Sequence, residues 1–368
     1  MTQLRGAERS PKATDRTAAA EIRSASLPRA LGVAFVLLLV SAAIGVSLGP
    51  TSLSLATVWN GIAEHLPLVP HGHVDPVDGA IMWQIRAPRV VLAGIVGAML
   101  AGGGATYQGV FRNPLADPYL LGVAAGGGLG ATIVIVFGGS SELLPVAAFA
   151  GATLAVVMTY ALGATTRWDT GPGSVGVGNT SIILAGVAVA ALLTAVQTYL
   201  LQQHLTTIQT VYGWLLGQLT LASWGDVRTV APYATVAAIV LVALAARLDV
   251  LRVGEEEAST LGIDPGKLRL ALIATATLGT AAAVAVSGLI GFVGIIVPHM
   301  VRLTTSSSYR ILLPVSMVAG AAFLILADVA ARTVQAPSEV PLGVITAILG
   351  APFFLFVLRS RRARSTLS

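Results

Sequence analysis

The stretch Arg112-Asn113-Pro114-Leu115-Ala116-Asp117-Pro118 is a polar turn, broken by two prolines, between two long apolar runs. The upstream run covers residues 90–111 and the downstream run covers residues 120–137, and each carries three consecutive glycines. Each run approaches the roughly 20 residues that a helix needs to cross the hydrocarbon core of a bilayer. The turn carries an arginine, and cytoplasmic loops of membrane proteins are enriched in cations. This stretch therefore predicts the inner mouth between two membrane-spanning helices.

The composition predicts an all-α polytopic membrane protein. Of the 368 residues, 55% are hydrophobic and 11% are charged, whereas soluble domains carry about 25% charged residues. The absence of cysteine excludes disulfides and Cys-based metal sites. The net charge is +5 at pH 7, but the cations flank apolar runs. We therefore expect the lipid bilayer, and no nucleic acid, as a partner.

The apolar runs predict about ten membrane spans. They cover residues 30–48, 90–111, 120–137, 143–164, 181–201, 227–246, 268–286, 288–303, 311–331 and 340–358. The run 288–303 is too short, and too broken by Gly291, Gly294 and Pro298, for an ordinary crossing. The segment 202–221 is aromatic and polar, which predicts an interfacial half-helix. The transmembrane domain is thus expected over residues 30–358. It follows a basic, disordered cytoplasmic tail at 1–29 and precedes a basic cytoplasmic tail at 359–368.

The distribution of cations predicts the orientation of the chain. With both termini in the cytoplasm, only Arg86, Arg89, Arg228 and Arg332 of the 22 Lys and Arg residues would lie outside. The positive-inside rule favours this orientation over its inverse. Glycine-interrupted segments also occupy comparable places in the two halves of the chain, at 102–118 and 288–298, with opposite expected directions. That arrangement indicates an inverted repeat around a central pathway.

Three blocks of sequence, in order along the chain, carry a resemblance to a known family. They are Arg86-Ala87-Pro88-Arg89 with residues 108–118 and 121–123; residues 288–294 with Val297-Pro298-His299 and Arg302; and residues 326–328 with Arg332, 339–343 and 350–352. These blocks resemble the permease subunits of type II ABC importers for iron chelates, haem and vitamin B12. The likeness covers nearly all of the chain after the amino-terminal tail.

The resemblance implies the permease subunit of a binding-protein-dependent ABC importer, with the type II permease fold, in the cytoplasmic membrane of a bacterium. A ferric siderophore is the expected cargo, and haem and vitamin B12 are the alternatives within the family. The implied partners are a second permease copy, in a homodimer or heterodimer, two ATPase subunits and an extracytoplasmic substrate-binding protein.

The sequence holds no nucleotide-binding motif. Its only lysines are Lys12 and Lys267, and neither belongs to a Gly-x-x-x-x-Gly-Lys-Ser/Thr loop. We therefore expect a chain that is not an enzyme and binds no cofactor, with ATP and Mg²⁺ on the partner ATPase. An ion-coupled secondary transporter is the alternative, but Asp328 is the only acid well within a predicted span. Arg332, one turn later, indicates a local ion pair for this acid.

Two further chemistries are disfavoured. His71 and His73 form a His-x-His pair, but without carboxylates in a suitable pattern we interpret them as solvated loop histidines and expect no metal site. Ser287 and His299 suggest a serine hydrolase, yet Ser287 does not lie in a Gly-x-Ser-x-Gly elbow.

The resemblance also implies site residues on the outer side and along the pathway. Arg86, Arg89 and Arg332 match positions at the outer rim that pair with glutamates of the binding protein. The fifth and tenth spans would line the pathway near a dimer axis, and their exposed side chains would include Thr194, Gln197 and Tyr199.

On the inner side, the resemblance implies a gate formed by Asn113 and Leu115 in the turn and by Asn179 and Thr180 before the fifth span. Pro114 and Pro118 prevent the backbone of the turn from continuing as a helix. Irregular backbone at membrane depth is tolerated only where it lines a cavity or packs within protein.

The charged segment 247–267 carries two helix-start signals. Gly254 precedes three glutamates, which stabilise the amino end of a helix dipole, and Asp264-Pro265 is a capping acid followed by proline. We therefore predict two short helices, one of which ends near Gly262. The resemblance implies that the first is a coupling helix that docks into the ATPase. Its expected docking residues are Gly254, Glu255, Glu256, Ala258, Leu261 and Gly262.

Overall fold

The computed structural model describes residues 27–49, 53–64, 72–165 and 179–365, and within these ranges the regular structure is helical. Seven helices are long and apolar enough to cross a membrane, with the α4–α5 segment counted as one. They are α2 (Leu27–Ser47), α4 to α5 (Pro76–Val110), α7 (Leu143–Thr165), α8 (Asn179–Gln203), α10 (Trp224–Val253), α12 (Pro265–Ser287) and α14 (Tyr309–Thr333). Three more helices are apolar but have shorter apolar stretches: α6 (Val123–Val136), α13 (Val293–Thr304) and α15 (Leu342–Ser365), which is apolar over Leu342–Leu355. The predicted all-α membrane fold with about ten spans is confirmed.

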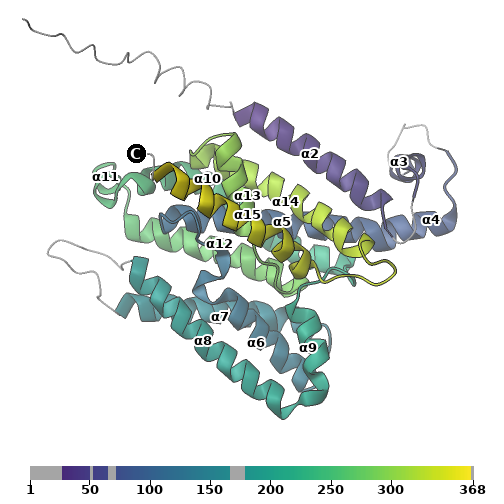
Figure 1. Ribbon diagram of the computed structural model, residues 1–368, viewed down its shortest axis with the longest axis horizontal. Coiled ribbons are helices and arrows are strands. Elements are labelled where there is room, and N and C mark those ends of the chain that lie inside the picture. The colour runs from purple at the N-terminus through teal and green to yellow at the C-terminus, as the bar shows by residue number, and fades with distance from the viewer. Residues whose placement is uncertain (1–26, 50–52, 65–71, 166–178, 366–368) are drawn as a thin grey trace, which may run out of the picture.

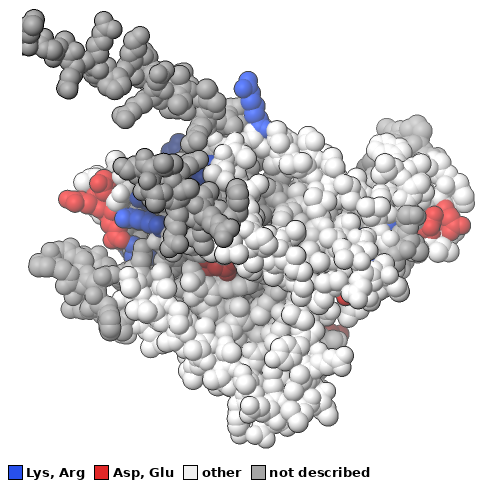
Figure 2. All heavy atoms as spheres, viewed as in Figure 1, with Lys and Arg blue, Asp and Glu red and all other residues white. Residues whose placement is uncertain are grey.

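The remaining elements are short and lie at the ends of the long helices. They are α3 (Leu55–Ala63), the π-helical segment Ile81–Arg86 between α4 (Pro76–Ala80) and α5 (Ala87–Val110), the 3₁₀ turns Pro118–Leu121 and Leu205–Thr207, α9 (Ile208–Leu215) and α11 (Glu255–Thr260). In Figure 1, α11 lies at the left end of the molecule and α3 and α4 at the right end. Figure 2 shows acidic side chains at both of these ends, with a largely uncharged surface between them. The uncharged band agrees with a surface that faces lipid.

Helix α5 forms the centre of the fold, where α14, α12, α10 and α13 pack around it. Its glycines permit this contact, because a Cβ on Gly97 would overlap the carbonyl group of Gly320 in α14. A Cβ on Gly104 would likewise overlap the backbone of Gly294 in α13. Small residues at helix crossings allow backbones to approach in this way.

Several predicted boundaries differ from the structure. The span expected at 227–246 extends to Val253, so the first part of the charged segment 247–267 belongs to α10. The predicted short helix near Gly262 is confirmed as α11, but the second short helix is wrong: Asp264 caps the first turn of the long helix α12. The carboxy-terminal tail expected from residue 359 continues α15 to Ser365. The tail expected at 1–29 lies outside the described residues up to residue 26, and residues 27–29 begin α2.

Candidate functional site

A buried cluster of ion pairs joins the carboxyl end of α14 to the amino end of α5. The guanidinium of Arg89 donates from Nε and Nη2 to Asp328 Oδ1, over 3.0 and 2.8 Å. The same group donates from Nη1 and Nη2 to the two carboxylate oxygens of Glu339, over 2.8 and 2.9 Å. Arg89 and Asp328 are both buried. The planar, five-donor guanidinium can serve two carboxylates at once, which the ammonium of lysine cannot do in this geometry.

The other two arginines of the expected outer rim belong to the same cluster. Arg332 lies 3.3 Å from Asp328 Oδ2 and donates to the Gly45 carbonyl in α2 over 2.7 Å. Arg86 donates to the carbonyl groups of Val46 and Ser47 at the carboxyl end of α2, over 2.7 Å each. All three arginines are buried and bonded within the chain, and their pairing with the binding protein stays a prediction. Their charges are used to hold helix ends together.

Glu339 connects this cluster to the loop after α9. Thr220 Oγ1 donates to Glu339 Oε2 over 2.8 Å. Partial burial alone would raise the pKa of the Glu339 carboxyl, but hydrogen bonds from Arg89 and Thr220 hold that pKa below its ordinary value. The cluster therefore stabilises Glu339 in its charged, carboxylate form.

Three irregular segments meet beside Glu339. The backbone N–H groups of Leu342 and Gly343 donate to the carbonyl groups of Gly217 and Leu216, over 2.9 and 3.0 Å. The N–H of Gln218 donates to the carbonyl of Ser287 over 2.9 Å. Gly217 has a φ of 71°, a left-handed conformation that glycine adopts at little cost. These bonds tie the end of α9, the loop after α12 and the start of α15 into one junction.

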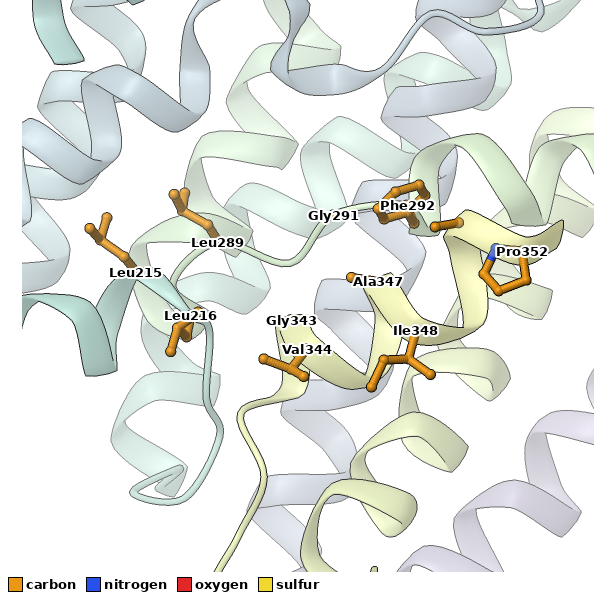
Figure 3. A pocket seen from close by; sticks show the side chains of 11 residues that line it. Leu215, Leu216, Leu289, Gly291, Phe292, Gly343, Val344, Ala347, Ile348 and Pro352 are labelled. Atoms are coloured by element: carbon orange, nitrogen blue, oxygen red, sulfur yellow. The ribbon is translucent and has the colours of Figure 1, made fainter. Parts of the chain in front are cut away.

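An apolar groove of about 730 Å³ runs from this junction along α15. Figure 3 shows Leu215, Leu216 and Leu289 at one end of the groove, and Phe292 and Pro352 toward the other. Val344, Ala347 and Ile348 of α15 form one wall. None of the described residues that line it has an ionisable side chain. The groove can therefore accept a bulky apolar surface but offers no charged group to fix a small ion.

The three pathway residues expected on the fifth span lie apart from this groove. Thr194 and Tyr199 are exposed on α8 but are not among the residues that line the groove. The expected exposure of Gln197 is wrong: its side chain is 7% exposed, and Nε2 donates to Thr132 Oγ1 of α6 over 2.9 Å. Gln197 therefore holds two helices together.

The turn after α5 is the segment that the sequence predicts to form the inner mouth. Asn113 Oδ1 accepts from the N–H of Leu115 over 3.0 Å, and Asp117 Oδ1 accepts from the N–H of Tyr119 over 2.8 Å. Leu115 is exposed at the tip. Asn179 and Thr180 begin α8, with Thr180 exposed. The role of Asn113, Leu115, Asn179 and Thr180 as a gate stays a prediction. The side chain of Asn179 lies outside the described part of the chain.

The expected coupling segment is the short helix α11 with its flanking residues, Gly254 to Gly262, which we call the α11 knob. Gly254 precedes α11 and Gly262, with a φ of 74°, follows it. Glu255 forms an ion pair with Arg269 of α12, and Glu256 is exposed. The expected contact through Ala258 is wrong, because this residue is 0% exposed and packs inward. Leu261 is 67% exposed, and Val253, which the sequence analysis missed, is 70% exposed.

Within the described ranges, no group of three or more His, Asp or Glu side chains could hold a metal ion. His73 is exposed, and its predicted partner His71 lies outside those ranges.

Comparison with known proteins decides the family. The model of the FecCD transport family matches residues 37–360. The chain belongs to the FecCD transport family. Similar proteins include the cobalamin import system permease protein BtuC of Halobacterium salinarum, 39% identical over 94% of this chain and 99% of that protein. The hemin transport system permease protein HmuU of Yersinia pestis is 37% identical over 91% of this chain and 97% of that protein.

A solved structure supports the same assignment. A metal-chelate type ABC transporter in an inward-facing conformation matches with a TM-score of 0.79 at 29% identity, over 90% of this chain and 99% of that one. This FecCD chain is thus an ABC-importer permease, a polytopic membrane subunit and not an enzyme. The pairing of Asp328 with Arg332 was predicted from their spacing. Glu339 belongs to one of the three sequence blocks, but its pairing with Arg89 and its bond to Thr220 carried no sequence signal.

Proposed function

We propose that this FecCD permease moves an iron chelate, with a ferric siderophore as the preferred cargo, across the cytoplasmic membrane. ATP and Mg²⁺ bind to two partner ATPase subunits, and an extracytoplasmic binding protein delivers the chelate. Both termini lie in the cytoplasm. The single observation that carries the choice of cargo is the apolar groove along α15, whose described lining residues have no ionisable side chain. Such a wall suits a bulky chelate whose metal charge is already enclosed.

Uptake measurements test this cargo directly. Cells that lack this gene should lose uptake of radiolabelled iron given as a ferric siderophore, and the gene on a plasmid should restore it. Haem and cobalamin, each given separately, serve as the competing cargoes. Lost uptake of haem or cobalamin with unchanged siderophore uptake would reassign the cargo within the family.

We propose a second copy of a FecCD permease as the partner across the groove. The groove is open on one side, where its wall residue Ile348 is exposed. A second copy would close it and would bring two inner turns toward one axis. In this arrangement Leu115 and Thr180 narrow the inner mouth.

Cysteine cross-linking checks the inner gate. The chain has no native cysteine, so Leu115→Cys and Thr180→Cys introduce single reactive sites. Cross-linking to the symmetry mate should change between nucleotide-free and ATP-trapped transporters and should block uptake. Val36→Cys, on the exposed face of α2, is the matched control and should have no effect. Absent cross-links in every state, or cross-links without effect on uptake, would place the gate elsewhere.

We propose that the α11 knob docks into the ATPase through Leu261 and Val253, and not through Ala258. Leu261→Asp places a charge on an exposed apolar contact, so it should weaken co-purification of the ATPase and reduce uptake while the chain still folds. Leu221→Asp, at a leucine that is even more exposed than Leu261 and lies at the predicted outer side, should leave ATPase binding unchanged. Intact ATPase binding and uptake in the Leu261 variant would contradict the docking role.

A further inference from the structure

The last turn of α10 is bonded to two segments that are distant in sequence. The carbonyl of the buried Leu251 accepts a hydrogen bond from Arg112 Nη2 in the inner turn, over 2.9 Å. Asp249 accepts from Ser308 Oγ and from the N–H of Tyr309, over 2.6 and 2.7 Å, and so caps the first turn of α14. The α11 knob begins at Gly254, directly after this turn. The end of α10 therefore contacts both the inner turn and the knob.

Arg112 occupies a position at which glycine is usual. Its φ is 51°, in the left-handed region. The N–H of Arg112 donates to the Gly109 carbonyl over 3.2 Å, and the N–H of Asn113 donates to the Gln108 carbonyl over 3.1 Å. This pair of bonds is a Schellman motif, whose left-handed residue is most often glycine because a Cβ is disfavoured there. The strain of an arginine at this position indicates that its side chain has a role that glycine could not fill.

The side-chain bond gives that role a physical basis. The last carbonyl groups of a helix lack intrahelical partners, and the carboxyl end of the helix dipole attracts cations. The Arg112 guanidinium supplies both a donor and a positive charge to the end of α10. Because its bond is to a backbone carbonyl, the inner turn follows the position of α10 itself and not that of one mobile side chain.

We propose that Arg112 is a positioning residue that carries movement of the α11 knob, through the end of α10, to the inner turn at Asn113 to Leu115. The proposal rests on the proposed docking of α11 to the ATPase. When the knob moves with the ATPase, the last turn of α10 moves with it, and the guanidinium transmits this displacement to the turn. Removal of the Arg112 side chain should leave the inner turn folded, but the turn should no longer follow the movement of α10.

Arg112→Gly is the decisive variant. Glycine keeps the Schellman motif, and relieves its strain, while it deletes the guanidinium. Arg310→Ala is the matched control: this arginine is exposed near the same end, and its side chain makes no hydrogen bond or ion pair with the described residues. Arg112→Lys is a second variant that retains the charge and one donor, and it should behave between the parent and Arg112→Gly.

The first measurement uses the full chain in lipid nanodiscs, with a spin label at Leu115→Cys. Arg112→Gly should increase the mobility of this label, and Arg310→Ala should not. The second measurement uses the transporter reassembled with its ATPase. Arg112→Gly should retain ATPase binding and ATP hydrolysis but lower uptake by at least about fivefold, as expected for the loss of a typical coupling between two sites.

Three results would overturn the proposal: unchanged label mobility, unchanged uptake despite increased mobility, or loss of the ATPase from the complex. In the last case Arg112 would support the docking knob and would not transmit its movement. Failure of the docking proposal itself is distinguished by the Leu261→Asp variant, which tests ATPase binding without touching Arg112.

Discussion

Arg89→Met should be among the most destabilising single substitutions in this permease. The change removes the cation that faces the buried Asp328 and leaves that carboxylate without its main partner. Loss of one member of a buried ion pair typically costs about 3–5 kcal/mol of folding free energy, because the other charge stays buried without compensation. The unfolding temperature in detergent and the yield of folded protein should both decrease clearly.

Two companion variants make this test specific. Lys267→Met removes a cation from an exposed pair with Asp264, whose side chains are 88% and 53% exposed, and should change stability little. Asp328→Asn added to Arg89→Met removes the carboxylate that lost its main partner, but it also removes the charge that faces the buried Arg332, so it should recover only part of the loss. Equal effects of Arg89→Met and Lys267→Met would show that the cluster contributes no more than a surface pair.

Gly104→Ala should disrupt the contact between α5 and α13. The new Cβ would overlap the backbone of Gly294, which cannot turn away as a flexible side chain could. Overpacking in a dense core typically costs about 1–3 kcal/mol and occasionally more, and a clash of a Cβ with a neighbouring backbone belongs at the upper end. Since α13 follows directly after the groove residue Phe292, we also expect uptake to be lost. Unfolding temperature and uptake in cells measure the two effects.

Gly32→Ala is the control for this substitution. Gly32 lies within α2 with open space around the position of a Cβ, and alanine favours helices over glycine by roughly 0.5–1 kcal/mol. This variant should therefore be as stable as the parent or slightly more stable. A Gly104→Ala protein with parental stability and uptake would mean that α5 and α13 separate at little cost.

Local sequence determined the helices and the class of protein. Long apolar runs predict spans because each backbone polar group in lipid must be satisfied within its own helix. The Asp264-Pro265 signal marked a helix start correctly, because a cap acts on the N–H groups of its own first turn, although the helix is the long α12 and not the short one predicted. The three sequence blocks were also enough to indicate the family, which the family model over residues 37–360 bears out.

The tertiary structure alone decided which side chains are available to a partner. Arg86, Arg89 and Arg332 lie near the predicted outer side, but their bonds reach residues far along the chain, such as Glu339 for Arg89. Gln197 and Ala258 are also buried by contacts within the chain. A membrane helix is apolar on both its lipid face and its packed face, so periodicity does not distinguish the two faces as it does in soluble proteins. Which face is buried depends on where neighbouring helices pack, and that is a property of the assembled fold.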